Sequence, residues 1–562
     1  MKRYLEYILF TSILVSITAC NGNSRELTEE QIEISEELKT RFEGTEHLIY
    51  NGDTLLASDD VIAYYKKTDF EPIWTSKKKL NNRGKEMFDL VENARDHGLH
   101  PEMFSYTLLS QMKDTALLDC EMVLTNAFFL YTTHIDVGWL DPETYLYVWK
   151  KDSLDYDLSL ELDKVRNGAT PKDVITSHQP NFWEYKQLQA GLEKFLDDYP
   201  LDTNEFNIPP FKEDSVKCYK YAHEALIGHS FLDSSVTAQD SVFIEQLKVF
   251  QRINGLLDDA IVGKWTGKAL NKSNRERFYS AAISLEKWRW KKPYPKKYIR
   301  VNVPEFTLYF VDSNVVKSKH RVVVGHPTTS TPEFHATMRR MVTNPFWHVP
   351  YSIASTEILY GAKKDSSYFS KRGYKVFKDG EQINPSTVDW SDVSQGGFRY
   401  KVRQDGGGGN SLGRIKFLFP NIHSVFIHDT PSKSLFGNDV RAYSHGCVRL
   451  QHPFELAKKM LIADGSDLHA DTLDSYVRRG LQRVIELEDP FEVYIEYITS
   501  TGDSSGNVIF HPDIYGRDKK YVENSLKLFD KYGPDFFKHK PTPPAKTEEE
   551  IEVVEATQPS EE

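Results

Sequence analysis

The chain changes its hydrophobic pattern once, near Tyr298, and this change most restricts how it can fold. Before that point, apolar residues recur at three- and four-residue spacing, as in NRGKEMFDLVENARDHGL and EYKQLQAGLEKFLDDY, which predicts amphipathic helices. After it, apolar and polar residues alternate in YIRVNVPEFTLYFVDSNVVKSKHRVVVGHP, which predicts consecutive β-strands. Because 562 residues are too many for one core, we expect several domains, helical first and strand-rich later.

The helical part divides into two predicted units. Residues 57–230 form a helical scaffold without chemical motifs of their own. Residues 231–275 form a small unit in which Phe243, Leu247 and Phe250 share one helix face and Gly255 ends the first helix. The run FQ, GL, an acidic turn, VG, T and AL in this second unit resembles the small peptidoglycan-binding domain of cell-wall hydrolases. An ordinary helical hairpin is the alternative.

The strand-rich domain is predicted over residues 276–520, entered by a linker helix that ends in EKWRWKKPYP. Residues 351–405 interrupt the alternation and predict an insertion over one rim. Strands resume at RIKFLFP and HSVFIHDT, and the helix HPFELAKKMLIADG follows. The run DGGGGN at 405–410 lacks a following Lys-Ser/Thr, so it is no phosphate loop, and we expect a flexible rim.

The N-terminus has the pattern of an export signal. A basic Met1-Lys2-Arg3 precedes an apolar stretch, Tyr7 to Ala19, that is too short to span a bilayer comfortably. Ile17-Thr18-Ala19-Cys20 resembles a bacterial lipobox, so we expect a signal peptide at 1–19, lipidation of Cys20 and a tether at 20–56 that includes a first helix. An ordinary secretory signal is the alternative. Either implies export, and lipidation implies a membrane-anchored periplasmic lipoprotein, with the lipid as its one membrane attachment.

Charge excludes one class of function. Lys and Arg number 70 against 82 Asp and Glu, and the Pro- and Glu-rich tail at 541–562 carries seven Glu and one Lys, half of the net −12. We expect that tail to be disordered. The remaining chain is nearly balanced, which gives no support to nucleic-acid binding.

The four cysteines are Cys20, Cys120, Cys218 and Cys447. If Cys20 is lipidated, three remain, and an odd number in an oxidising compartment leaves at least one free thiol. Cys120 and Cys218 lie in helical surroundings and are predicted to be packing residues, with a disulfide between them as the alternative. Cys447 is then the thiol that chemistry would use.

Cys447 lies in RAYSHGCVRL, and three interpretations of it compete. A metal site with His423 and His428 is disfavoured, because an odd separation along a strand points the two side chains to opposite faces. Inert packing does not explain the polar neighbours. A nucleophile does, since His428 can take the thiol proton and the N–H groups of Gly446 and Cys447 can stabilise an oxyanion. Arg449 can bind a carboxylate through two N–H groups or brace the loop.

The run HDT…SHGCVRL resembles the signature of the YkuD-type L,D-transpeptidases. The likeness extends from about 55 to 520 and to the large YcbB-like branch, which has a helical scaffold, a peptidoglycan-binding domain and then a catalytic domain. The similar stretches are EKWRW, VNVPEFTLYFVD, RVVVG, NPFWHVPYSIA, LGRIKFLFPN, HDTP, RAYSHGCVRL and HPDIYGRD.

The resemblance implies a multidomain protein whose catalytic domain is mainly β (α+β), with a capping insertion at about 351–405. By motif, Cys447 is the nucleophile and His428 the proton donor and acceptor, while Ser444, His445, Gly446 and Arg449 support them. The implied reaction needs no metal or cofactor, joins a tetrapeptide donor stem to a diaminopimelate acceptor, and makes the protein a carbapenem target. D,D-carboxypeptidases or glycan polymerases are the implied partners.

Three alternatives stay open on the sequence. Water in place of the amine would make a hydrolase with the same nucleophile. A protein lysine would make an enzyme that attaches proteins to the wall. A site without turnover would leave a wall-binding lipoprotein.

Overall fold

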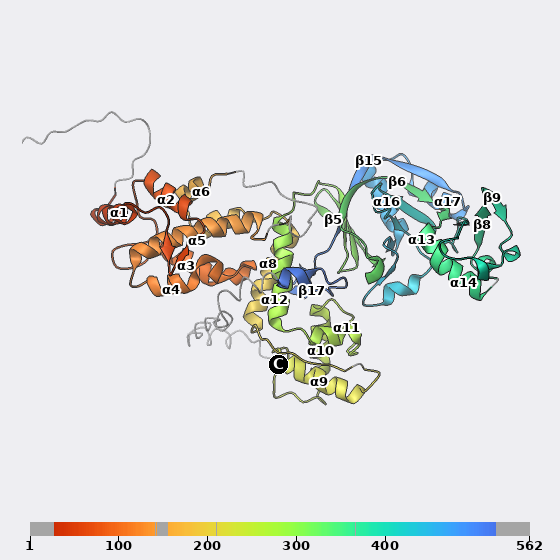
Figure 1. Ribbon diagram of the computed structural model, residues 1–562, viewed down its shortest axis with the longest axis horizontal. Helices are drawn as coiled ribbons and strands as arrows, with labels where there is room; N and C mark the ends of the chain where they lie inside the picture. The colour runs from red at the N-terminus through yellow and green to blue at the C-terminus, as the bar shows by residue number, and fades with distance from the viewer. Residues whose placement is uncertain (1–26, 141, 143–155, 210, 366, 524–562) are drawn as a thin grey trace, which may run out of the picture.

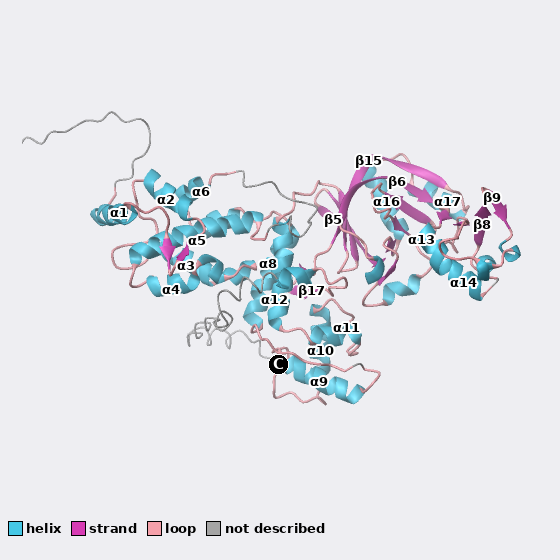
Figure 2. Ribbon diagram, in the orientation of Figure 1, coloured by secondary structure: helices cyan, strands magenta, loops and turns pink. Residues whose placement is uncertain are grey.

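The computed structural model describes residues 27–140, 142, 156–209, 211–365 and 367–523. The predicted signal peptide, Cys20 and the acidic tail at 541–562 lie outside them. Figure 1 shows helices at one end, a strand-rich domain at the other, and a helical arm of α9 to α11 between them. Figure 2 shows that strands concentrate in the second half of the chain, as the change of periodicity near Tyr298 predicts. None of the described helices is long and apolar enough to cross a bilayer.

The first helical unit packs around one long central helix, α5. Its apolar core gathers buried residues from Ile34 to Ile175. Its elements are α1 (Glu29–Phe42), β1 (Ile49–Tyr50), β2 (Asp53–Thr54), α2 (Ser58–Lys67), α3 (Asn82–Glu92), α4 (Tyr106–Met112), α5 (Leu117–Val137), α6 (Leu158–Arg166) and α7 (Pro171–Ser177).

The first helix predicted within the tether at 20–56 is α1, but this helix belongs to the first folded unit. Thr28 and Gln31 form a capping box that starts α1, and α1 buries Ile34, Leu38 and Phe42 in the core of the first unit. A helix that buries three apolar side chains is part of the folded domain. Any tether is therefore confined to the residues before α1.

A second helical core does not follow the predicted boundary at residue 230/231. It joins α8 (Trp183–Asp198), α9 (Ser215–Gly228), α10 (Ser241–Ile253), α11 (Lys264–Leu270) and α12 (Asn274–Arg289). The side chain of Cys218 on α9 donates to Val262 O at 3.7 Å, so α9 packs with the predicted peptidoglycan-binding unit. Cys218 and Cys120 are free and buried in different cores, so the alternative disulfide is absent.

Helix α12 connects the units, and its EKWRW run is buried although it is rich in charge. Glu286 accepts hydrogen bonds from the N–H groups of Trp139 (2.6 Å) and Leu140 (2.8 Å), which come just after α5 of the first unit. Lys287 pairs with Asp518 near the end of the strand-rich domain at 2.9 Å. The predicted linker helix is thus a fixed junction, and β17 (Val508–Phe510) lies beside it in Figure 1.

The strand-rich domain is a nine-stranded sheet in the order β13-β5-β14-β12-β11-β6-β15-β3-β4. A further pairing of β4 with β5 closes the sheet into a barrel. Its strands are β3 (Tyr298–Asn302), β4 (Thr307–Asp312), β5 (Val315–Gly325), β6 (Phe334–Thr343), β11 (Ile415–Leu418), β12 (Ile427–His428), β13 (Ala442–Ser444), β14 (Val448–Leu450) and β15 (Arg483–Glu496). Helix α16 (Pro453–Asp464) packs into its core, with α17 (Ala470–Arg478) beside it, and a hairpin of β16 (Ser500–Gly502) and β17 packs on α8.

The insertion between β6 and β11 is a subdomain with a core of its own, called the cap here. A four-stranded sheet, ordered β7-β10-β8-β9, packs with short helices around Phe369 and Trp390. The elements are β7 (Trp347–His348), α13 (Tyr351–Ile353), a π-helix (Ala354–Ile358), α14 (Leu359–Lys364), α15 (Tyr368–Lys371), β8 (Tyr374–Lys378), β9 (Glu381–Ile383) and β10 (Lys401–Gln404).

The two ends of the glycine run, Gly406 and Asn410, form the base of this cap. A Cβ on Gly406 would lie 2.2 Å from Asn344 O, so the two chain segments that enter and leave the cap touch there. The Asn410 amide donates to Pro345 O at 3.2 Å and to Asp405 O at 2.9 Å, which ties the same two segments together. Gly406 and Asn410 are thus close-packed, whereas a Cβ on Gly407 or Gly409 would have nothing within 4 Å, so a flexible rim stays a prediction for the middle of the run.

Candidate active site

The strands that carry the predicted site have one core face and one polar face. Ile415 and Phe417 of β11, Ile427 of β12 and Val448 of β14 point into the barrel core. Side chains alternate along a strand, so Lys416, His428 and the Cys447–Arg449 pair lie on the opposite face. The alternation that builds the core therefore also gathers the candidate catalytic groups.

Cys447 is placed by the parallel pairing of β12 with β14. The register matches Ile427 with Val448 and His428 with Arg449, and the Val448 N–H donates to Phe426 O at 3.1 Å. Cys447 precedes Val448 and therefore lies opposite Phe426. Phe426 is two residues before His428 in the chain. The structure thus brings Cys447, His428 and Arg449 to one patch of two adjacent strands.

The turn before Cys447 is held by hydroxyl groups. Ser444 Oγ donates to Cys447 O at 2.5 Å and accepts from the Gly446 N–H at 3.1 Å. Gly446 has φ +108°, a conformation that side chains disfavour, and Thr331 Oγ1 donates to its carbonyl at 2.9 Å. Since the Gly446 N–H is already bonded, its predicted oxyanion role requires the Ser444 bond to open.

The Cys447 side chain is a protonated thiol at rest. Burial raises its pKa, while the Phe426 N–H, Arg449 and Lys416 act in the opposite direction. The thiol donates weakly to Ser424 O at 3.9 Å. A thiol with a raised pKa needs a base to become a nucleophile.

His428 has the tautomer that such a base requires. Its Nδ1 lies 2.5 Å from the Asp429 carbonyl oxygen, which can only accept, so Nδ1 carries the proton and Nε2 carries a lone pair. Burial lowers the pKa of His428 to about 4, with Arg449 and Lys416 lowering it further and the Asp429 carbonyl opposing. The imidazole is therefore neutral near pH 7.

Asp429 fixes the strand end that carries His428. Its carboxylate accepts from the Arg414 N–H at 2.9 Å and contacts the Lys433 ammonium. Gly413 leaves room for this carboxylate, because a Cβ there would lie 2.3 Å from Asp429 Oδ2. Asp429 was not singled out from the sequence, although it directly follows His428 in HDT.

Comparison with known proteins places this site within a known type of catalytic domain. Residues 296–479 match the L,D-transpeptidase catalytic domain of the YkuD family, and residues 59–192 match the Scaffold domain. The chain carries an L,D-transpeptidase catalytic domain. A Haemophilus influenzae protein named "Putative L,D-transpeptidase" is 31% identical over 239 residues, 42% of this chain and 47% of that protein. The chain thus spans about half the length of the curated relative it matches.

Solved structures also match, two of them at low sequence identity. One is titled "Structure of the Ldtfm-avibactam carbamoyl enzyme", with 12% identity, TM-score 0.18, and 36% of this chain and 49% of the other covered. The other is an L,D-transpeptidase from Mycobacterium smegmatis, with 13% identity, TM-score 0.17, and 36% and 58% covered.

In the L,D-transpeptidase domain, the side chain of His445 faces the cap and does not join His428 beside Cys447. Its Nε2 contacts the Glu357 carboxylate on the π-helix of the cap, and both side chains are substantially exposed. The S-H-G-C turn therefore touches the cap directly. His445 links the nucleophile loop to the subdomain above it.

The metal interpretation finds no ligand set in the part of the chain that the structure describes. No three His, Cys, Asp or Glu side chains gather there as ligands would. His423 lies before β12, and its ring is tilted against that of Phe334 with 5.2 Å between the centroids.

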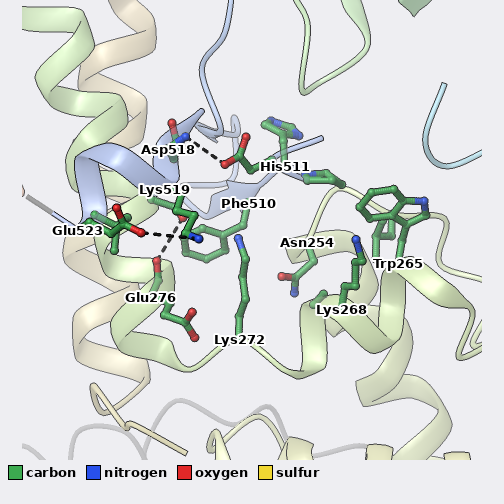
Figure 3. A pocket seen from close by; sticks show the side chains of 16 residues that line it. Asn254, Trp265, Lys268, Lys272, Glu276, Phe510, His511, Asp518, Lys519 and Glu523 are labelled. Carbon is green, nitrogen blue, oxygen red and sulfur yellow. Dashed lines mark hydrogen bonds and ion pairs between the residues drawn. The ribbon is translucent and has the colours of Figure 1, made fainter. Parts of the chain in front are cut away.

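A cavity of about 510 Å³ lies away from Cys447, at the junction of α11, α12 and the segment after β17 (Figure 3). Trp265, Lys268 and Asn254 line one side, and Lys519 and Glu523 the other. None of its lining residues lies in the run HDT…SHGCVRL, although four belong to HPDIYGRD: His511, Pro512, Asp513 and Asp518. Peptidoglycan binding by the unit at 231–275 stays a prediction.

Proposed function

We propose that the protein is a cysteine-dependent L,D-transpeptidase that forms 3→3 cross-links in peptidoglycan. One observation carries the proposal. The Nδ1–H of His428 is bonded to the Asp429 carbonyl, which leaves Nε2 as an acceptor on the strand beside Cys447. The match of residues 296–479 to the L,D-transpeptidase catalytic domain supports the same chemistry.

The first half-reaction transfers the donor stem to the enzyme. Cys447 Sγ attacks the carbonyl carbon of the third residue of a tetrapeptide stem while His428 Nε2 takes the thiol proton. The tetrahedral oxyanion collapses, the amide C–N bond breaks, and His428 returns its proton to the departing D-alanine amine. A thioester on Cys447 and free D-alanine result.

The second half-reaction regenerates the enzyme. The side-chain amine of a diaminopimelate on a neighbouring stem attacks the thioester, and His428 takes the proton that the amine loses. The C–S bond breaks, and the sulfur recovers that proton. One amide bond is exchanged for another, so the reaction needs neither an oxidant nor an energy source.

The electrostatics favour a neutral starting pair. The pKa of His428 is lowered to about 4 and the pKa of Cys447 is raised, both mainly by burial, so imidazole and thiol are uncharged near pH 7. The proton then moves as the carbon–sulfur bond forms. Charge develops as that bond forms and lies on the tetrahedral oxyanion and on the imidazolium of His428.

The cap favours an amine acceptor over water. It contacts the nucleophile loop through Glu357 and His445, which places it where it can limit access of solvent to the thioester. Water as acceptor would give a hydrolase, a protein lysine would give protein attachment to the wall, and no turnover would leave a wall-binding lipoprotein. We further propose that the enzyme is held in the periplasm by a lipid on Cys20.

Intact-protein mass spectrometry after incubation with a carbapenem tests the proposal. We expect a covalent adduct on the native chain, none on Cys447→Ala, and slowed formation on His428→Ala. Cys218→Ala and His423→Ala are matched controls, because the first removes a buried thiol and the second an imidazole outside the site, and both should react normally.

Disaccharide-tetrapeptide then identifies the acceptor. A dimer joined between two third residues, with release of D-alanine, supports the transpeptidase. Disaccharide-tripeptide as the one product would identify a hydrolase. A folded native protein that forms no adduct and no product would exclude Cys447 as a nucleophile and leave the wall-binding lipoprotein.

A further inference from the structure

Two cations flank His428 in a row that crosses three strands. Lys416 on β11 is the register partner of His428, and His428 is in turn the partner of Arg449 on β14. Residues that pair directly across strands point to the same face, so Lys416 and Arg449 lie on either side of the imidazole. The Lys416 ammonium lies 5.7 Å from the ring centroid of Phe426, the residue opposite Cys447.

Among the residues that the structure describes, no carboxylate neutralises either cation. Each is partly buried, and burial lowers the pKa of both side chains while the neighbouring Cys447 acts to raise it. No hydrogen bond or ion pair of the Lys416 ammonium or the Arg449 guanidinium is found within the described ranges, whereas Lys433 nearby pairs with Asp429. Two desolvated cations without a counter-ion are costly, which indicates that an anion from outside the chain completes this site.

We propose that Lys416 and Arg449 together bind the terminal carboxylate of the donor stem, the carboxylate of the D-alanine that leaves. This rests on the proposed function and adds the group by which the enzyme recognises where its donor ends. Arg449 offers two parallel N–H donors to a carboxylate, and Lys416 supplies a second positive charge from the other side.

The covalent distances of the substrate fit this arrangement. His428 must reach the amine nitrogen of the leaving residue to protonate it. The carboxylate of that residue is joined to the same nitrogen through a single Cα. Adjacent strands lie about 4.8 Å apart, so side chains on the two strands beside His428 can reach a group one Cα away from the imidazole.

The same geometry selects between donors of different length. A stem with one more residue has a neutral amide carbonyl at this place instead of a carboxylate. It would leave the two cations without a counter-ion in a desolvated site.

A different role for Lys416 would be to stabilise the Cys447 thiolate alone. In that case its removal would slow every reaction of Cys447 to the same extent, whatever the substrate. Recognition of a carboxylate instead changes the ratio between two donors that differ in that group alone. The experiment therefore compares, for each variant, the ratio of the reaction rates with the two donors.

Two forms of the tetrapeptide donor are used with the full-length protein, one ending in D-alanine and one in D-alaninamide. The rate of acyl-enzyme formation is followed by intact-protein mass spectrometry. We expect the native protein to prefer the acid by about 10- to 100-fold, the size of one charge-assisted hydrogen bond. Lys416→Met should lose about tenfold or more of that preference, through slower reaction with the acid and little change with the amide.

Two variants serve as controls. Lys416→Arg keeps the charge and should retain most of the preference. Lys401→Met removes an exposed lysine of the cap sheet and should leave both rates unchanged. Iodoacetamide labelling of Cys447 and the melting temperature report whether Lys416→Met keeps a folded, reactive site.

The possible results distinguish three claims: carboxylate recognition, the role of Lys416 and the proposed function. Equal rates of the native protein with acid and amide donors would overturn carboxylate recognition while leaving the transpeptidase proposal intact. A preference that survives in Lys416→Met would overturn the role of Lys416. Failure of both donors and of the carbapenem to acylate Cys447 would overturn the proposed function and this inference together.

Discussion

At the scale of single residues, the site depends on burial and on one carbonyl. Burial keeps both the Cys447 thiol and the His428 imidazole neutral, and the Asp429 carbonyl decides which imidazole nitrogen holds the proton. A neutral pair differs from a preformed thiolate–imidazolium pair in how its reactivity depends on pH.

We therefore predict two distinct pH profiles. Alkylation of Cys447 by iodoacetamide should increase with pH without levelling off below pH 9.0, the ordinary pKa of a thiol, because burial raises the pKa. Acylation by a carbapenem should be nearly constant near neutral pH and fall as the pH approaches about 4, where His428 becomes protonated and cannot act as a base. Alkylation that reaches a plateau near pH 7 would instead indicate an ion pair.

The sequence predicted most of these residues but not Lys416. Cys447 and His428 stand out because a cysteine with polar neighbours and a nearby histidine form a chemical pattern. Lys416 in RIKFLFP has the appearance of any outward-facing residue of an alternating strand. Its significance comes from the register of β11 with β12, which brings it beside a histidine twelve residues away.

At the scale of elements, helix α12 shows what a sequence pattern cannot contain. The sequence predicted a linker helix there, and in the structure its Lys287 forms a buried pair with Asp518, 231 residues away. A hydrophobic pattern identifies a buried helix only when the side chains that it buries are apolar. Tertiary packing determines which two charged residues so far apart in the chain form an ion pair.

Replacing Lys287 should destabilise the junction strongly. Lys287→Met leaves the Asp518 carboxylate buried without its cation, which should lower the free energy of unfolding by about 3–5 kcal/mol. Lys248→Met is the matched control, because Lys248 pairs with Glu245 at 2.8 Å on the surface of α10, and should cost less than about 1 kcal/mol. Urea unfolding of both variants measures the difference.

A second substitution separates charge from packing. Lys287→Met combined with Asp518→Asn removes the unpaired carboxylate, and part of the lost stability should return. Equal losses in the single and double variants would show that Lys287 contributes through packing alone.

At the scale of the whole molecule, the order of units was predictable and their boundaries were not. The change of periodicity located the barrel, and the break in alternation located the cap. The boundary at 230/231 failed because α9 has the same helical spacing whichever core it joins. The base of the cap was missed because Gly406, which allows close contact with Asn344, cannot be told apart in the sequence from its open neighbours Gly407 and Gly409.

The cap should be removable without unfolding the barrel. It has its own core, and its two connecting strands pair with each other, with His348 opposite Arg403. Replacing residues 349–402 by Asn-Gly would close these strands as a two-residue hairpin. The barrel core contains no residue of the excised segment, so we expect the remaining protein to fold and to keep its carbapenem adduct.

What should change is the fate of the thioester. Without the cap, water reaches the acylated Cys447 more easily, so the ratio of hydrolysed tripeptide to cross-linked dimer should increase, as measured from the products of disaccharide-tetrapeptide. Glu357→Gln, which removes the cap's carboxylate from His445 and leaves the cap in place, should give a smaller change in the same direction. An unchanged ratio in the cap-deleted protein would show that the barrel alone selects the amine.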